Sequence, residues 1–221
     1  MSPDTVSAVW LSARVAVLAT ALNAVIGVPL AYLLARRRFR GRRVVDLLVT
    51  LPLVLPPTVT GYYLIALLGR RGLLGSPLYS LTGWTIAFTW YAAVIAATVM
   101  ALPLVVRTAR AAIESVDRDL ERAAYTLGRS EWQTALTITL PLARNGILAG
   151  LVLAFARALG EFGATLMLAG NIPGRTATVP LAIYTAMQTG ESGQALVLVG
   201  LLTALSCAVL VVADRLGAEA R

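Results

Sequence analysis

The pattern of apolar and polar positions divides the chain into five long apolar runs separated by shorter polar segments. Within each run, apolar residues follow one another instead of alternating as they do in a half-buried strand. A helix that crosses the hydrocarbon core of a bilayer needs about 20 such residues. We therefore predict one all-α transmembrane domain over residues 1–221, with membrane-spanning helices at about 10–35, 44–68, 84–106, 145–169 and 195–213.

The distribution of arginine predicts the orientation of these spans, because cytoplasmic loops carry the excess of positive charge. Segments 36–43 and 107–144 hold six Arg each and the C-terminal tail holds two, against three in the alternate loops. The N-terminus is therefore predicted outside and the C-terminus inside. Segment 36–43 then serves mainly as a topology anchor, with contact to anionic membrane lipid as a secondary effect. Since topology explains the net charge of +8, we expect no nucleic-acid partner.

A sixth apolar stretch, 178–187, is too short to cross the bilayer and contains Pro180. It lies between the outward-facing ends of the last two predicted spans. We predict either a short helix on the outer face or a re-entrant segment.

Composition agrees with a membrane protein and argues against an enzyme. Hydrophobic residues make up 58% of the chain and charged residues 14%, whereas soluble domains average about 25% charged residues. The chain has no His, the usual general base, and its single Cys, Cys207, rules out an internal disulfide. We expect no catalytic residue, cofactor site or metal site in this chain.

The longest polar segment, at about 115–141, predicts two short helices joined by a bend. Asp117 is a candidate N-cap for the first helix, and Gly128 is typical of the residue that ends a helix. A capping-box pattern at 130–133 starts the second helix. Pro141 is predicted to end or kink that helix where it enters the fourth span.

Apolar side chains form a narrow stripe on each of these short helices. The first stripe consists of Leu120, Ala123, Ala124 and Leu127, and the second of Trp132, Ala135 and Leu136. The alanines keep the first stripe narrow, so a partner's groove can approach the backbone closely. We favour docking of a partner protein. The alternative, an amphipathic helix lying on lipid headgroups, fits a stripe this weakly apolar less well.

The same segment resembles the cytoplasmic loop of ABC importer permeases, which reads EAA, three residues, G, nine residues, I, any residue, L, P. The positions in register are Ala123, Ala124, Gly128, Ile138, Leu140 and Pro141. The motif's Glu position is occupied by Arg122, and the acidic residue stands one place earlier, at Glu121. We call residues 115–141 the coupling loop; its candidate ATPase-coupling residues are Leu120, Glu121, Ala123, Ala124, Leu127, Gly128, Trp132 and Pro141. Because of the shifted acid, we expect Gly128 and the Ala123–Ala124 surface to matter more for coupling than Glu121.

The resemblance narrows to the molybdate/tungstate permeases through LPLVLPPTVTGYYL (51–64), FARALGEFGATLMLAGNIPG (155–174) and TVPLAIYTAMQTGE (178–191). The related sulfate/thiosulfate permeases share parts of these segments and remain the alternative. The resemblance implies a type I ABC importer permease fold and a homodimer in the bacterial inner membrane. It also implies two ATPase subunits that bind ATP and Mg²⁺, and a periplasmic or lipid-anchored binding protein that delivers the oxyanion. The chain itself has no GxxxxGK[ST] motif, so another chain must bind the nucleotide.

Two ionisable residues, Arg157 and Glu161, lie inside the fourth predicted span. A central charge costs about 2.5–3.5 kcal/mol on insertion scales, so both should face protein or water. They either lie on the translocation path or its gate, or form a mutual ion pair that only holds the bundle together. Pro56 and Pro57 interrupt the second span and predict either a bent, pore-lining helix or a packing kink.

Two other functions compete with a partner-driven permease. A free-standing, ion-driven anion transporter would use Arg157, Glu161 and Asp46 and would need no ATPase. A membrane enzyme or scaffold is disfavoured because no paired catalytic groups are evident. The coupling loop, together with the missing nucleotide motif, favours the permease.

Overall fold

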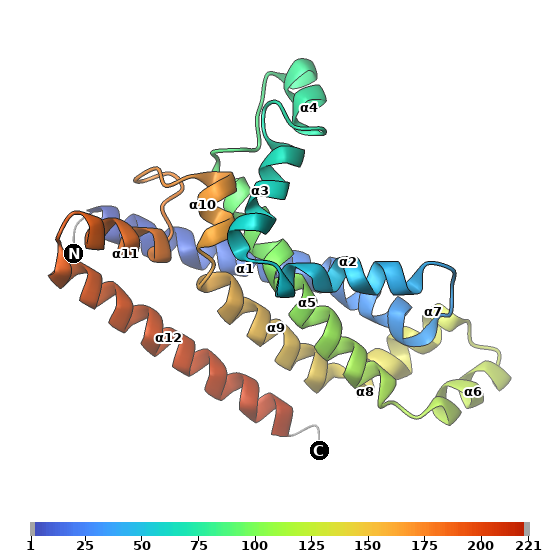
Figure 1. Ribbon diagram of the computed structural model, residues 1–221. Coiled ribbons are helices and arrows are strands. Elements are labelled where there is room, and N and C mark those ends of the chain that lie inside the picture. The colour runs from blue at the N-terminus through green and yellow to red at the C-terminus, as the bar shows by residue number, and fades with distance from the viewer. Residues whose placement is uncertain (1–2, 219–221) are drawn as a thin grey trace.

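Three helices form the centre of the protein. The computed structural model describes residues 3–218, and that part of the chain is helical throughout apart from turns and loops (Figure 1). α1 (Pro3–Arg36) packs along α5 (Trp90–Glu114), and α9 (Arg144–Leu159) lies against both. This arrangement confirms the predicted all-α class.

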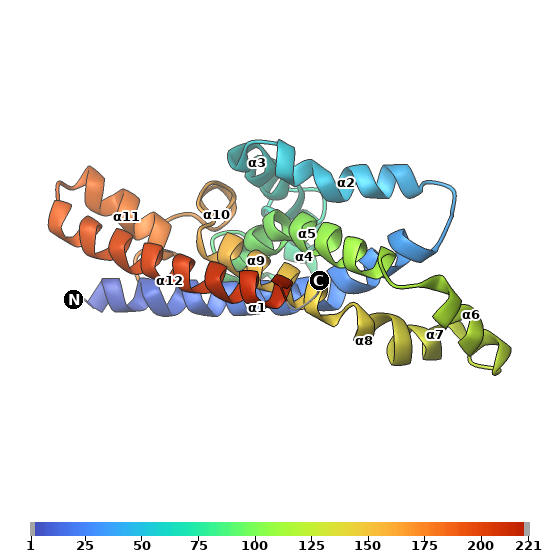
Figure 2. The ribbon, with the colours of Figure 1, turned by 90° about the horizontal axis from the view of Figure 1, so that it is seen from below.

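The last two helices pack beside this centre. α12 (Ser192–Ala218) lies against α9 and also contacts α11 (Val179–Gln188) (Figure 2). α11 contains the apolar stretch for which two structures were predicted. It is a short helix with Pro180 in its first turn, where a missing N–H costs nothing.

Small side chains bring the central helices together. One buried cluster contains Ala16 and Ala19 of α1 together with Ala92, Ala93, Ala96 and Ala97 of α5. Farther along, Gly27 lies so close to α5 that a Cβ atom there would be 3.1 Å from Val105 Cγ1. Close backbone approach through small residues is a common means of helix association in membranes. Lipid tails are as apolar as the side chains, so close packing stabilises the pair in place of the hydrophobic effect.

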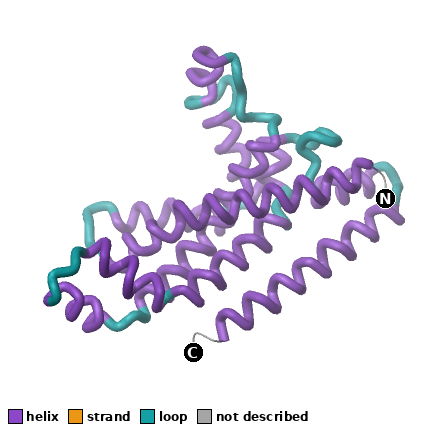
Figure 3. The backbone as a smooth tube through the Cα atoms, turned by 180° about the vertical axis from the view of Figure 1, so that it is seen from behind, coloured by secondary structure: helices purple, strands orange, loops and turns teal. Residues whose placement is uncertain are grey.

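The second predicted span is two helices and not one. α2 (Arg42–Val54) ends before an extended Leu55, and α3 (Pro57–Leu68) begins with Pro57 at its first position. Two consecutive prolines remove two backbone donors, so the helical ladder cannot continue through them. α4 (Gly75–Thr82) follows α3 and stands away from the bundle (Figure 3).

The third predicted span is displaced along the chain. The sequence predicts 84–106, whereas α5 begins at Trp90 and continues to Glu114. Thr89 caps the helix by accepting a hydrogen bond from the N–H of Ala92, and Phe88 before it has a φ of 62°. The residues from 84 to 89 are therefore a loop, although they are apolar enough to suggest a span.

The fourth predicted span is also interrupted. α9 ends at Leu159, and α10 (Gly163–Ala169) begins after a three-residue break. α10 packs against α3, so the broken parts of two predicted spans meet.

Three described helices, α1, α5 and α12, are each long and apolar enough to cross a membrane. The bent pair 131–142 and 144–159 adds a fourth if it is counted as one span. The membrane class is confirmed, while the count of five spans and the outside position of the N-terminus stay predictions.

Candidate functional site

The coupling loop begins with the predicted capped helix. α6 (Arg118–Thr126) follows Asp117, whose Oδ1 accepts a hydrogen bond from the N–H of Asp119 at 2.9 Å. Gly128 has a φ of +81°, and the N–H of Arg129 returns to the carbonyl of Ala124 at 3.1 Å. A left-handed glycine with such a returning bond is the common way to end a helix. The predicted cap and glycine bend are confirmed.

The second half of the loop starts with the predicted capping box. In α7 (Glu131–Thr134), the N–H of Gln133 donates to Ser130 Oγ at 3.3 Å, and the Ser130 N–H donates to Gln133 Oε1 at 3.0 Å. Each side chain therefore satisfies a backbone donor that the helix leaves open.

The helix does not end at Pro141 but kinks next to it, which is one of the two predicted outcomes. α7 passes into a π-helical turn, η1 (Ala135–Thr139), and then into α8 (Leu140–Leu142), which contains Pro141. The π turn widens the helix just ahead of the residue whose ring would otherwise clash with a carbonyl four positions earlier. The 73° bend between 131–142 and α9 comes after Pro141, at Ala143.

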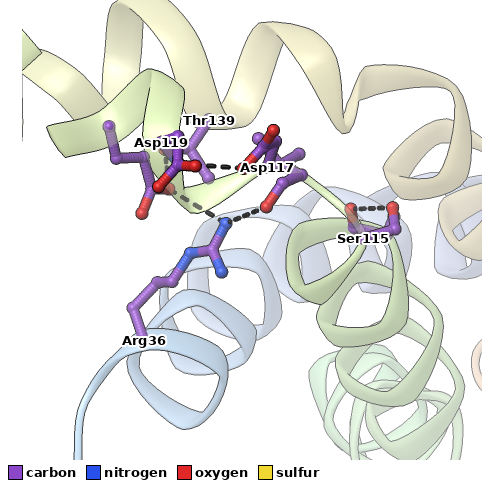
Figure 4. A network of polar contacts seen from close by, with 8 residues as sticks. Arg36, Ser115, Asp117, Asp119 and Thr139 are labelled. Atoms are coloured by element: carbon purple, nitrogen blue, oxygen red, sulfur yellow. Dashed lines mark hydrogen bonds and ion pairs between the residues drawn. The ribbon is translucent and has the colours of Figure 1, made fainter. Parts of the chain in front are cut away.

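A buried ion pair fastens the coupling loop to the end of α1. Arg36 Nη2 lies 3.0 Å from Glu121 Oε1, and the two side chains are only 6% and 8% exposed. The Thr139 hydroxyl donates to the same carboxylate oxygen at 2.6 Å, and Arg36 also donates to the carbonyl of Val116 at 3.0 Å. Figure 4 shows Arg36 and Thr139 at this junction of α1, α6 and η1.

This network is what sequence reasoning missed. The sequence suggests Arg36 only as a topology anchor and leaves the role of Glu121 uncertain. Eighty-five positions separate the two residues, so no local pattern pairs them. The sequence held a partial signal that Glu121 faces inward: it lies three positions before Ala124, so the two share a face of the helix. Both residues are buried in the structure.

The side chains of the predicted apolar stripes point in two directions, some toward solvent and others into the protein. Leu120, Leu127 and Trp132 are exposed by 47%, 82% and 67%. Ala124 and Ala135 are buried at 3% and 1%, so they pack inward and cannot offer a docking surface. Within the predicted stripes, the larger side chains are free for a partner, and the surface at Ala123–Ala124 is reduced to Ala123.

Further polar contacts hold the two ends of the loop. Arg37, the residue that follows α1, donates from Nε to Glu131 Oε1 at 2.8 Å, next to the capping box. Burial, followed by the carboxylates of Glu121 and Glu131, raises the pKa of Tyr125. Two ion pairs thus hold the loop, a buried one to the last residue of α1 and an exposed one to the residue that follows it.

The candidate path residues meet at the break between α9 and α10. Arg157 Nη1 lies 2.6 Å from Glu161 Oε2. Glu161 is buried at 2% exposure, and its other oxygen accepts the N–H of Ala164 at 2.8 Å. Glu161 therefore lies in the break and caps α10, instead of sharing a helix face with Arg157. Their ion pair exists, and a role on the path stays a prediction.

The proline break of the second span lies against this same region. A Cβ atom on Gly163 would lie 2.9 Å from Pro57 Cβ, and one on Gly61 would lie 2.7 Å from Met167 Cβ. Only glycine permits such an approach of α3 to α10. Pro57 therefore lies against the residue two positions after Glu161, and both Pro56 and Pro57 remain exposed.

Asp46, the remaining ionisable residue considered for a path, lies elsewhere. Its Oδ1 is 3.2 Å from Arg110 Nη1 on α5. This pairing fixes α2 to α5 near the Arg-rich segment 36–43.

The fold defines the class of the protein. The chain matches, over 100% of both lengths, a chain of the MetNI methionine ABC transporter in an inward-facing conformation, with a TM-score of 0.77 and 19% identity. This is the fold of type I ABC importer permeases, as predicted. Residues 27–219 match the model of binding-protein-dependent transport system inner membrane components, and the chain belongs to this family.

Two relatives are similar to this chain over most of their length. The chain is 53% identical over 190 residues to the molybdenum transport system permease protein ModB of Escherichia coli K12, covering 85% of this chain and 83% of that protein. It is 48% identical over 184 residues to ModB of Haemophilus influenzae, covering 83% and 80%. The recognition of an oxyanion permease from its motifs is confirmed.

Proposed function

We propose that this chain is the membrane-spanning subunit of an ATP-driven importer that carries molybdate or tungstate across the bacterial inner membrane. Similarity over most of the chain to two molybdenum transport permeases supports the substrate class. The family itself is defined by dependence on a binding protein, which supports a partner that delivers the anion. A sulfate or thiosulfate permease is the second candidate.

In the proposed assembly, two copies of the chain stand on two ATPase subunits, which bind ATP and Mg²⁺. The observation that carries this proposal is the coupling loop, which exposes large apolar side chains and is fastened to the bundle by a buried ion pair. An ATPase that binds Leu127 and Trp132 would displace α6 when it moves. The Arg36–Glu121 pair would pass that displacement to α1, which packs along α5.

Uptake of radiolabelled molybdate into vesicles that hold the complete complex tests the substrate. We expect uptake only with ATP, and unlabelled tungstate should compete far better than sulfate. Equal competition by sulfate would replace molybdate by the second candidate. Uptake that follows an ion gradient without any ATPase would instead support a free-standing transporter.

The coupling role is tested by Leu127→Glu, because a buried charge at a docking surface costs several kcal/mol. Uptake should fall at least tenfold, and less ATPase should co-purify. Leu73→Glu is the matched control, since Leu73 is a leucine of similar exposure, 78% against 82%, in the turn before α4. If both variants transport alike, the loop is not the docking surface.

A further inference from the structure

Segment 36–43, which includes the end of α1, the turn after it and the start of α2, holds more positive charge than the protein neutralises. Of its six arginines, Arg36 pairs with Glu121 and Arg37 with Glu131. Within residues 3–218, Arg38, Arg40 and Arg43 take part in no ion pair. Unpaired cations of this density attract an anion.

Several of these cations line one pocket of about 590 Å³. Arg38, Arg42 and Arg43 come from the turn and the start of α2, and Arg110 comes from α5. The acidic complement is small: Asp46 pairs with Arg110 at 3.2 Å, and Glu114 lies 2.8 Å from Arg110 Nε and 3.9 Å from Arg42. Four guanidinium groups thus line the pocket with one carboxylate, Asp46, while Glu114 pairs with two of them from outside the lining. Arg38 and Arg43 stay available to a ligand.

The surface that continues from this pocket is apolar. α2 begins at the pocket and buries none of its residues. Val44, Leu47, Leu48 and Val54 are exposed by 60%, 62%, 59% and 77%. A ligand that satisfies both surfaces has an anionic head and a long apolar tail.

We propose that the pocket binds the phosphate of an anionic phospholipid, with the acyl chains lying along α2. Basic pockets beside membrane-spanning helices on the cytoplasmic side commonly hold such headgroups. The planar guanidinium groups of Arg38 and Arg43 suit phosphate oxygens, which they can bind in pairs. The bound lipid neutralises the turn and covers the exposed face of α2.

The complete complex in nanodiscs provides the test, with spin-labelled phosphatidylglycerol and spin-labelled phosphatidylcholine of identical chains as probes. The wild-type complex should hold phosphatidylglycerol preferentially. Arg38→Gln with Arg43→Gln should weaken that preference at least fivefold, because two cations that attract an anionic headgroup are lost. Arg38→Lys with Arg43→Lys should retain most of it, which separates lost charge from lost folding.

Arg70→Gln with Arg71→Gln is the matched control, since it removes the same charge from the turn between α3 and α4. Equal losses in both double variants would overturn the site, because they would reflect net charge alone. No anionic preference in the wild type would also overturn it, as expected if a second copy of the chain covers α2. Displacement of the labelled lipid by millimolar inorganic phosphate would reassign the pocket to a free oxyanion and overturn the lipid.

Discussion

At the scale of single residues, the acid that departs from the family motif has an internal role. Glu121 does not face a partner; it is buried between Arg36 and the Thr139 hydroxyl. Breaking a buried ion pair costs more than forming it gains, because the remaining charge is left unsolvated. The coupling loop therefore depends on Glu121 for its position, although the sequence assigned more weight to Ala123 and Ala124.

Glu121→Ala should destabilise the complex by about 3 kcal/mol, since Arg36 loses its counter-charge while it stays buried. Thermal unfolding of the purified complex measures the loss, and uptake should fall with it. Asp119→Ala is the control, because its ion pair with Arg122 is exposed, at 77% and 74%, and such pairs contribute little. Equal destabilisation by both changes would contradict the anchoring role of Glu121.

Gly128→Ala tests the bend of the coupling loop. A Cβ atom there meets nothing within 4 Å, but the φ of +81° costs a non-glycine residue about 1–2 kcal/mol. The strain should shift the loop and lower the amount of anion transported per ATP hydrolysed. Gly200→Ala is equally free of contacts and lies within α12, so it should leave that ratio unchanged. A normal ratio in Gly128→Ala would show that the bend tolerates other conformations.

At the scale of elements, two breaks in predicted spans face each other. The break after α2 falls at two consecutive prolines, whereas the break after α9 contains none. In the second case α9 ends at Leu159, and Glu161 caps α10 by accepting the N–H of Ala164. Broken helices within a membrane protein are tolerated where protein or water satisfies the freed backbone groups.

The Arg157–Glu161 pair provides a test of whether this junction serves transport. Arg157→Gln or Glu161→Gln alone should lower thermal stability, because each leaves one charge without its partner. The double variant should regain most of that stability, since neither charge remains. If the pair lies on the path, molybdate uptake by the double variant stays low; normal uptake would show that the pair only holds the bundle.

At the scale of the whole molecule, orientation decides which surface meets the ATPase. Cysteine labelling in a Cys207→Ser background checks it, with a maleimide that cannot cross the membrane. Leu73→Cys should react in intact cells, whereas Arg40→Cys should react only after permeabilisation, because the Arg excess is predicted inside. The reverse labelling would place the coupling loop outside and exclude an ATPase partner there.

The sequence by itself determined the all-helical membrane class, the caps and glycine bend of the coupling loop, and the family. These follow from local causes: apolar length, the hydrogen-bonding capacity of Asp117 and Ser130, and the backbone freedom of Gly128. The tertiary structure alone decided that Arg36 meets Glu121, that Ala124 turns inward and that α5 starts at Trp90. Such features depend on which distant helices lie side by side, and a single sequence carries no local signal for that.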